Sequence, residues 1–145
     1  MITFSYLSPV VFPCDVHHKT WLKAVIRVEG LQPGDIQYVF CNDQDLLQRN
    51  IQFLNHDTLT DIITFDNRVG ECVSGEIFIS VDRVQENAES LHVPIEDERL
   101  RVMVHGVLHL CGYKDKLPEE AVVMRQKENQ YIDLFHQSFG AWIPD

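Results

Sequence analysis

The sequence predicts an α+β domain with a small mixed sheet of about four strands and about five helices. Two patterns support this prediction. Short runs are rich in β-branched and aromatic residues, as in strands, and longer segments repeat apolar residues at helical spacing. The 145 residues have the usual length of one domain and contain no repeat, low-complexity tract or obvious linker. We therefore expect residues 1–145 to form a single domain.

Strands and helices are expected to alternate through the first part of the chain. The expected elements are, in order, a strand at residues 2–7, a helix capped by Asp15 and ended by Gly30, a strand at 35–41, and a helix capped by Asn42 or Asp43. Both helices carry apolar residues three and four apart, so each has one face to bury.

A hairpin and three further helices are expected to follow. In order, these are strands at 61–65 and 76–80, a short helix capped by Ser80, a helix with Pro94 in its first turn, and a last helix from Pro118 to about Gln137. The segment from Leu100 to Leu110 is nearly all apolar, which predicts a helix buried at the centre of the domain.

The composition is ordinary for a soluble globular protein, with 45% hydrophobic and 23% charged residues. No stretch approaches the roughly 20 apolar residues of a membrane span, and residues 1–6 do not resemble a signal peptide. We therefore expect a cytoplasmic protein with no membrane partner. The four cysteines are scattered, which favours reduced thiols. The net charge of −10 argues against a generally basic surface that coats nucleic acid, and we expect no binding to DNA.

Two histidines near the end of the central helix predict a metal site. His105 and His109 are four residues apart, so both imidazoles lie on one helix face and can bind one ion. Gly112 can adopt the left-handed turn that ends the helix, and Asp115 can then offer a carboxylate as the third ligand. Three protein ligands leave one position of a tetrahedral metal open for water, as in catalytic zinc sites.

The layout repeats the spacing of the metalloprotease motif H-E-x-x-H-x-x-G-x-x-H with one important change. Gly106 replaces the Glu that acts as general base in those proteases, so the usual route of peptide hydrolysis is missing. Two simpler alternatives stay open: the histidines as buried, hydrogen-bonded core residues or a surface pair, and Asp115 as a turn residue. Cys111 lies in an apolar run beside the site and is expected to be a packed thiol.

The segment from His105 to Asp115 resembles the signature of the YbeY family, H-G-x-L-H-L-x-G-Y-D-H. Two upstream segments strengthen the resemblance. Residues 60–65 are similar to the family's T-D-V-L-S-F strand, and residues 75–80 to its G-D-I-x-I-S strand. The three segments come in the family's order, and the resemblance covers most of the chain from about Asn50 to Asn129.

The resemblance implies a single α+β domain that binds one zinc ion, or another divalent metal, per chain. It also implies a single-strand-specific endoribonuclease that processes ribosomal RNA, including the 3′ end of the small-subunit RNA, and that helps in ribosome quality control. Because the chain has only 12 Lys and Arg, we expect a ribosomal protein or an assembly GTPase to dock it on the ribosomal RNA.

The sequence departs from the family pattern at two positions. Asp115 stands where the family has its last histidine, and an aspartate makes the site harder and less positive. Leu54 stands where the family usually has an arginine, in the segment before the T-D-V-L-S-F strand. The residues that could replace this arginine in binding phosphate are Arg68, Lys114, Lys116 and His56.

The expected mechanism depends on the metal and assigns no protein base. A bound ion lowers the pKa of its water toward neutrality, so hydroxide can form without a dedicated base. Glu76, Asp66 and Glu128 are candidates for supporting or proton-transfer roles. One alternative is a metallohydrolase that acts on another substrate class. The other is a non-catalytic ribosome-assembly factor, whose structural metal would need a fourth ligand such as Cys111.

Overall fold

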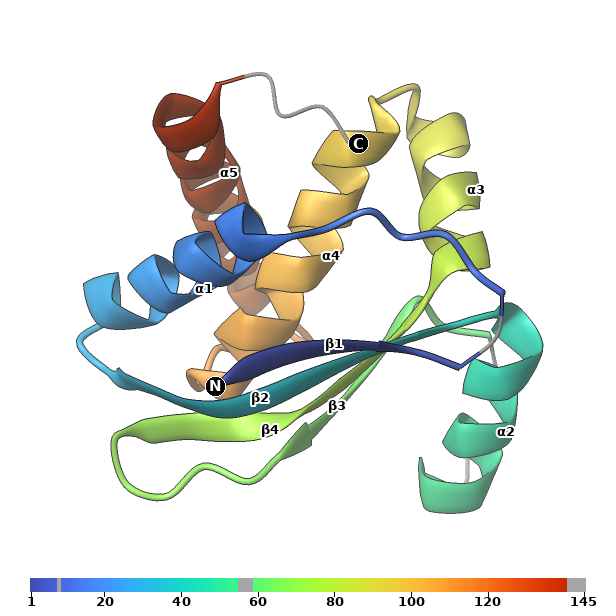
Figure 1. Ribbon diagram of the computed structural model, residues 1–145, viewed down its shortest axis with the longest axis horizontal. Helices are drawn as coiled ribbons and strands as arrows, with labels where there is room; N and C mark the ends of the chain where they lie inside the picture. Colours follow the sequence, from blue (N-terminus) through green and yellow to red (C-terminus); the bar gives the residue numbers. More distant parts are fainter. Residues whose placement is uncertain (8, 55–58, 141–145) are drawn as a thin grey trace.

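The computed structural model of the chain describes residues 1–7, 9–54 and 59–140. Within this part, four strands and five helices follow one another (Figure 1). In chain order they are β1 (Ile2–Tyr6), α1 (Val16–Val28), β2 (Gln32–Cys41), α2 (Asp43–Leu54), β3 (Ile62–Asp66), β4 (Cys72–Ser80), α3 (Val81–Leu91), α4 (Ile95–Leu110) and α5 (Pro118–Phe139). None of these helices is both long and apolar enough to cross a membrane. The predicted α+β fold is confirmed.

The strands form one mixed sheet in the order β1-β2-β4-β3. β2 pairs in parallel with β1 and with β4, whereas β3 and β4 form the expected antiparallel hairpin. Parallel neighbours need a crossover connection, and α1 provides it between β1 and β2. The helices α1, α3, α4 and α5 lie on one face of the sheet, and α2 lies on the other side (Figure 1). A small apolar cluster that includes Leu46 and Phe78 fills the space between α2 and the sheet.

Polar side chains cap the N-termini of three helices at the expected residues. The carboxylate of Asp15 accepts the His17 N–H at 2.8 Å, and the Asp15 N–H donates to His18 Nδ1 at 3.1 Å. Asn42 and Ser80 accept main-chain N–H groups at the starts of α2 and α3 in the same way. These bonds satisfy donors that the first helical turn would otherwise leave unpaired, so they fix where each helix begins.

The helix α4 is the central element of the core. It begins at Ile95, so Pro94 lies just before the first turn rather than within it. Most of its residues between Leu100 and Leu110 are buried, and it contacts the strands β3 and β4 as well as α1, α3 and α5. The fully buried Tyr38 of β2 donates its hydroxyl to the Met103 carbonyl at 2.7 Å, which ties the middle of α4 to the sheet.

The buried side chain of His18 is expected to make the fold sensitive to acid. His18 is 2% exposed, and burial lowers its pKa to about 4 in spite of the nearby Asp15 carboxylate. The unfolded chain therefore binds a proton that the folded chain does not bind between pH 6.5 and pH 4. The contribution of His18 to stability is fully present above this window, falls as the pH falls through it, and changes no further below it. The expected loss from this residue is roughly 3 kcal/mol.

The variant His18→Gln tests this prediction. Glutamine at this position can still accept the Asp15 N–H but cannot titrate. Denaturant unfolding measured from about pH 7 to about pH 4 should show a smaller loss of stability for His18→Gln than for the wild type. His17→Gln, at the half-exposed neighbouring position, should keep the wild-type loss. Equal slopes for His18→Gln and the wild type would contradict the assignment.

Candidate metal centre

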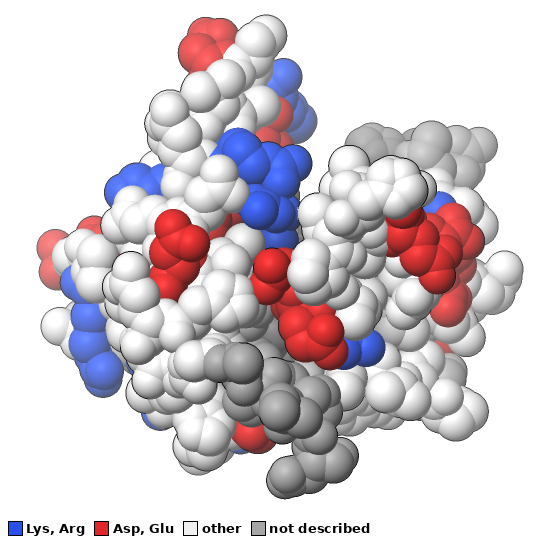
Figure 2. Space-filling model, turned by 90° about the horizontal axis from the view of Figure 1, so that it is seen from above, with Lys and Arg blue, Asp and Glu red and all other residues white. Residues whose placement is uncertain are grey.

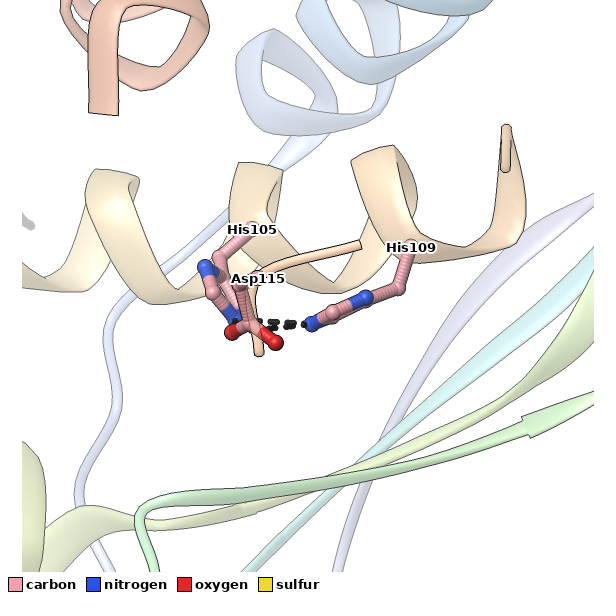
Figure 3. A group of neighbouring side chains, drawn as sticks. All are labelled: His105, His109 and Asp115. Atoms are coloured by element: carbon pink, nitrogen blue, oxygen red, sulfur yellow. Dashed lines mark hydrogen bonds and ion pairs between the residues drawn. The ribbon is translucent and has the colours of Figure 1, made fainter. Parts of the chain in front are cut away.

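Three side chains meet beside α4 (Figure 3). His105 and His109 extend from α4, and Asp115 extends from the loop between α4 and α5. The two Nε2 atoms are 3.0 Å apart, and Asp115 Oδ2 lies 3.2 Å from His105 Nε2 and 3.4 Å from His109 Nε2. Within the described residues, these three form the group of His, Cys, Asp and Glu side chains that could hold a metal ion. The residues predicted from the sequence are therefore brought together.

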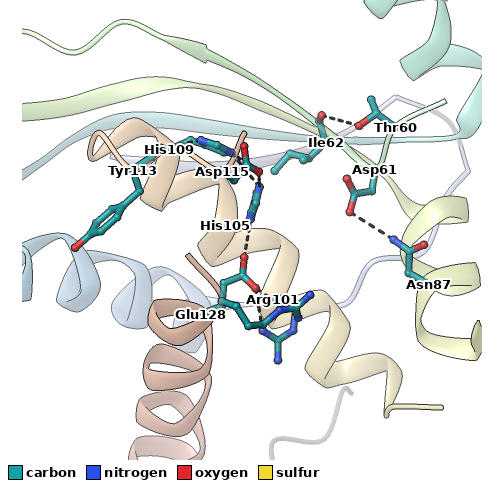
Figure 4. Close-up of polar contacts among 11 residues, drawn as sticks. Thr60, Asp61, Ile62, Asn87, Arg101, His105, His109, Tyr113, Asp115 and Glu128 are labelled. Atoms are coloured by element: carbon teal, nitrogen blue, oxygen red, sulfur yellow. Dashed lines mark hydrogen bonds and ion pairs between the residues drawn. The ribbon is translucent and has the colours of Figure 1, made fainter. Parts of the chain in front are cut away.

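Glu128 of α5 fixes the ring of His105 (Figure 4). Its carboxylate is 5% exposed and lies 2.6 Å from His105 Nδ1, and Arg101 donates to the same carboxylate at 2.9 Å. Burial disfavours a charged His105, but the carboxylates of Glu128 and Asp115 outweigh burial and raise the pKa of His105. Burial would raise the pKa of Glu128, but His105 and Arg101 outweigh burial and lower it. The site therefore favours positive charge beside a buried carboxylate.

The main chain fixes the ring of His109. Its Nδ1 lies 2.9 Å from the carbonyl oxygen of Tyr113, which can only accept, so Nδ1 carries the hydrogen. The same argument applies to His105 Nδ1, which faces the Glu128 carboxylate. In the neutral rings, both Nε2 atoms then direct lone pairs toward each other and toward Asp115 Oδ2. Three lone pairs directed into one space repel one another unless a cation lies between them.

The spacing of these three atoms suits a tetrahedral metal. Zinc binds imidazole nitrogen and carboxylate oxygen at about 2.0–2.2 Å, which puts neighbouring tetrahedral ligands roughly 3.3 Å apart. The observed separations are 3.0, 3.2 and 3.4 Å. The contacts of Glu128 and Tyr113 with the two Nδ1 atoms are of the kind that orients metal-binding histidines. The residues present therefore fit a divalent cation.

Gly106 faces the sheet, which accounts for the missing protease glutamate. A Cβ atom at this position would lie 2.9 Å from Ile77 Cγ2 and 3.0 Å from Ile62 Cδ1. These methyl groups belong to β3 and β4, on which α4 packs closely. A glutamate side chain would clash with the sheet, so the absence of this base follows from the packing of the helix.

The loop after α4 turns at Gly112, as predicted. Its φ of +111° lies in the region that favours glycine, and its N–H donates to the His109 carbonyl at 3.0 Å. Asp115 follows with a side chain that is 37% exposed, and the ion pairs of its carboxylate are with His105 and His109. This arrangement favours a ligand role for Asp115 over a turn-forming role.

The basic residues predicted to bind phosphate have different surroundings. Arg68 donates from Nε to the Gly70 carbonyl at 2.7 Å and from Nη1 to the Cys111 carbonyl at 3.1 Å, so it holds the C-terminal end of α4. Lys114 and Lys116 are exposed in the loop that carries Asp115. These two lysines are therefore better placed than Arg68 to meet a substrate.

The other candidates from the sequence contribute less to the site. Leu54 is the exposed last residue of α2, and His56 lies outside the described residues. Asp66 accepts the Arg68 N–H at 2.7 Å, and Glu76 pairs with Phe65 in the hairpin. Of the three acids considered for a supporting role, Glu128 is the one with a direct contact to His105.

Cys111 does not complete a closed four-ligand site. Its sulfur is not part of the three-residue group found in the described part of the chain. Burial, together with the nearby Glu29 carboxylate, raises the pKa of the Cys111 thiol to about 11, which favours a neutral thiol. Metal ligation by cysteine requires the thiolate. The described residues thus offer three ligands and leave one coordination position open.

Sequence reasoning missed two groups that the structure places at the site. Arg101 holds Glu128, and its signal was its position four residues before His105, on the same helix face. Asp61 lies beside the three side chains, and its Oδ2 accepts from Asn87 Nδ2 at 3.5 Å (Figure 4). Burial raises the pKa of Asp61, which His105 partly offsets. The sequence places Asp61 at the start of an expected strand, and no local pattern in it indicates that the side chain lies near the two histidines.

Known proteins resemble this chain over most of its length. The profile of the family described as Endoribonuclease YbeY matches residues 14–136. Curated proteins named Endoribonuclease YbeY from Flavobacterium psychrophilum and Flavobacterium johnsoniae are 47% and 48% identical to it over 136 residues. This alignment covers 94% of this chain and 97% and 98% of the two relatives. A solution structure from Thermotoga maritima matches with a TM-score of 0.69 and 25% identity, covering 96% of this chain and 91% of that one. The chain belongs to the endoribonuclease YbeY family.

Proposed function

We propose that this protein is a metal-dependent, single-strand-specific endoribonuclease that acts on ribosomal RNA in the cytoplasm. The enzyme would cleave precursor RNA in the maturation of the 3′ end of the small-subunit RNA, and it would also act in ribosome quality control. One observation carries the proposal: His105 Nε2, His109 Nε2 and Asp115 Oδ2 meet at tetrahedral spacing in a chain of the YbeY family.

The proposed cofactor is one zinc ion per chain, held by His105, His109 and Asp115. Two nitrogens and one oxygen are ligands that zinc accepts, although a carboxylate also suits harder divalent ions. When bound, the ion supplies Lewis-acid chemistry, because it lowers the pKa of water and offsets charge on a phosphodiester. Glu128 and the Tyr113 carbonyl keep the two rings in the binding orientation. Burial raises the pKa of the nearby Asp61, which favours a proton on this carboxyl.

Binding of RNA has to overcome the acidity of the chain. Figure 2 shows basic and acidic side chains interspersed on one face, with a basic group beside a hollow and acidic groups close to it. We assign the phosphate contacts nearest the reacting bond to Lys114 and Lys116, with Arg68 holding the end of α4 beneath the loop. Few phosphate contacts give weak affinity, so a ribosomal protein or an assembly GTPase would dock the enzyme on its RNA.

A non-catalytic ribosome-assembly factor with a structural metal is the second candidate. The residues at positions 54 and 115 favour it, since Leu54 replaces the family's arginine and Asp115 replaces its last histidine. The three-ligand group argues against it, because structural zinc sites are normally closed by four protein ligands. A hydrolase of another substrate class is less favoured, and the packing at Gly106 argues against a peptidase.

The first prediction from the proposed function concerns RNA cleavage. Purified protein should cut single-stranded RNA and leave a duplex of the same sequence intact. A chelator should abolish cutting, added zinc should restore it, and His109→Ala prepared in the same way should be inactive because it lacks one ligand. Equal residual cutting by the wild type and His109→Ala would indicate a contaminating nuclease, and the assembly-factor function would then replace this proposal.

The second prediction separates a ligand role of Asp115 from a turn-forming role. Asp115→Ala should lower zinc affinity by at least about 100-fold, because it removes one of three donors. Asp115→His, which supplies the family's donor, should stay within about 10-fold of the wild type. Competition with a coloured chelator measures both affinities. Wild-type affinity in Asp115→Ala would make Asp115 a turn residue.

The third prediction concerns the two loop lysines. The double variant Lys114→Ala/Lys116→Ala should raise KM for RNA several-fold with little change in kcat, and KM should depend less steeply on salt. Lys19→Ala/Lys23→Ala on α1 removes the same charge and serves as the control. If both pairs raise KM equally, the effect comes from net charge and the lysines of the loop have no special contact.

A further inference from the structure

We propose that Glu29 and Tyr113 form a positioning pair that sets the metal affinity of the centre by anchoring the Asp115 loop to α1 and α5. The inference rests on the proposed metal centre and adds two residues to it. Neither Glu29 nor Tyr113 supplies one of the three ligand atoms, so both would act through the residues that bind the ion.

The carboxylate of Glu29 joins three parts of the chain. Glu29 is the C-cap residue of α1, and its side chain is 10% exposed. Its Oε1 accepts the hydroxyl of Tyr113 at 2.6 Å, and its Oε2 accepts the hydroxyl of Tyr131 and the Lys127 ammonium, the latter at 3.3 Å. Burial alone would raise the pKa of Glu29, but these hydrogen bonds lower it. An ionised carboxylate is a stronger acceptor than a neutral group.

Tyr113 connects this carboxylate to the metal-binding loop. Its ring is directed away from His109 and Asp115 (Figure 4), whereas its carbonyl accepts from His109 Nδ1 at 2.9 Å. Asp115 follows two residues later. Apart from the contacts of the Asp115 carboxylate with the two histidines, the loop is next held where the Leu117 N–H donates to Glu120 Oε1 at 3.0 Å. The Tyr113 hydroxyl therefore fastens the loop at a point between its start and this bond.

The hydrogen bond between Tyr113 and Glu29 would affect the positions of two of the three metal ligands, His109 and Asp115. A shift of Tyr113 would move the carbonyl that keeps hydrogen on His109 Nδ1 and leaves Nε2 free to bind. It would also move the chain two residues before Asp115. Loss of such outer contacts typically lowers metal affinity about 10- to 100-fold. We therefore expect Tyr113→Phe and Glu29→Gln each to weaken metal binding by about 10-fold or more.

The variant Tyr131→Phe is the matched control. It removes a tyrosine hydroxyl from the same Glu29 carboxylate, but Tyr131 belongs to α5 and not to the loop. Both Tyr→Phe variants should lower the unfolding temperature of the metal-free protein, because each loses a bond to a largely buried carboxylate. Only Tyr113→Phe should lose metal affinity, whereas Tyr131→Phe should stay within about 3-fold of the wild type.

The experiment is a Co²⁺ titration of the full chain followed by visible absorption, with zinc affinity measured by chelator competition. No RNA is present. The proposal predicts losses of about 10-fold or more in Tyr113→Phe and Glu29→Gln, and little further loss when the two are combined. Circular dichroism of the metal-free variants checks that each one folds.

Two results would overturn the proposal: wild-type Co²⁺ affinity in Tyr113→Phe, or an equal loss in Tyr131→Phe. A wild type that binds neither Co²⁺ nor zinc would overturn the metal centre itself and this inference with it. Failure to cut RNA, with metal binding intact, would overturn the nuclease proposal alone.

Discussion

The close packing of α4 on the sheet is the constraint on which the site depends. At Gly106 the helix approaches β3 and β4 so closely that an added Cβ would lie 2.9 Å from Ile77. His105 and His109 lie on either side of Gly106 in the sequence, at the margin of this contact, with side chains 20% and 25% exposed. Each ring has a protected side, where its Nδ1 is hydrogen-bonded, and an accessible side, where its Nε2 is free to bind. Gly106 thus allows α4 to pack closely on the sheet while the side chains of His105 and His109 stay partly exposed.

Local patterns in the sequence were enough to predict the elements and the three meeting side chains. Asp15 and Ser80 begin helices because a short polar side chain can satisfy unpaired N–H groups, and this rule needs no tertiary structure. The histidine pair and Gly112 are likewise local features. The supporting contacts join residues far apart in the chain: Tyr113 and Glu29 are separated by 84 positions, and Arg101 and Glu128 by 27. Such pairs depend on how helices pack, which periodicity does not encode.

The acidity of the chain has opposite effects on the binding of a metal ion and on the binding of RNA by the proposed enzyme. Glu128, Asp115 and Asp61 all raise the pKa of His105, so the same field that favours a proton there favours a metal cation. These carboxylates also repel the phosphates of RNA. Arg101 reduces the repulsion by pairing with Glu128, which places a positive side chain one turn before His105. The carboxylates around His105 therefore favour binding of a metal cation, whereas attraction of RNA depends on a few nearby basic side chains.

The aspartate at position 115 shifts this balance further. Two neutral histidines and one carboxylate carry one negative charge, so a divalent ion would leave a net charge of about +1, against about +2 with a third histidine. Attraction between the centre and a phosphate scales with this charge. The charge of the carboxylate adds Coulombic attraction for the cation, which compensates for the poorer match between a hard oxygen donor and zinc, so the lower net charge chiefly affects the attraction of phosphate. A divalent centre with a net charge of about +1 therefore attracts the phosphates of free RNA less strongly than a centre with three histidines would, which is consistent with the proposal that a docking partner brings the RNA to the enzyme.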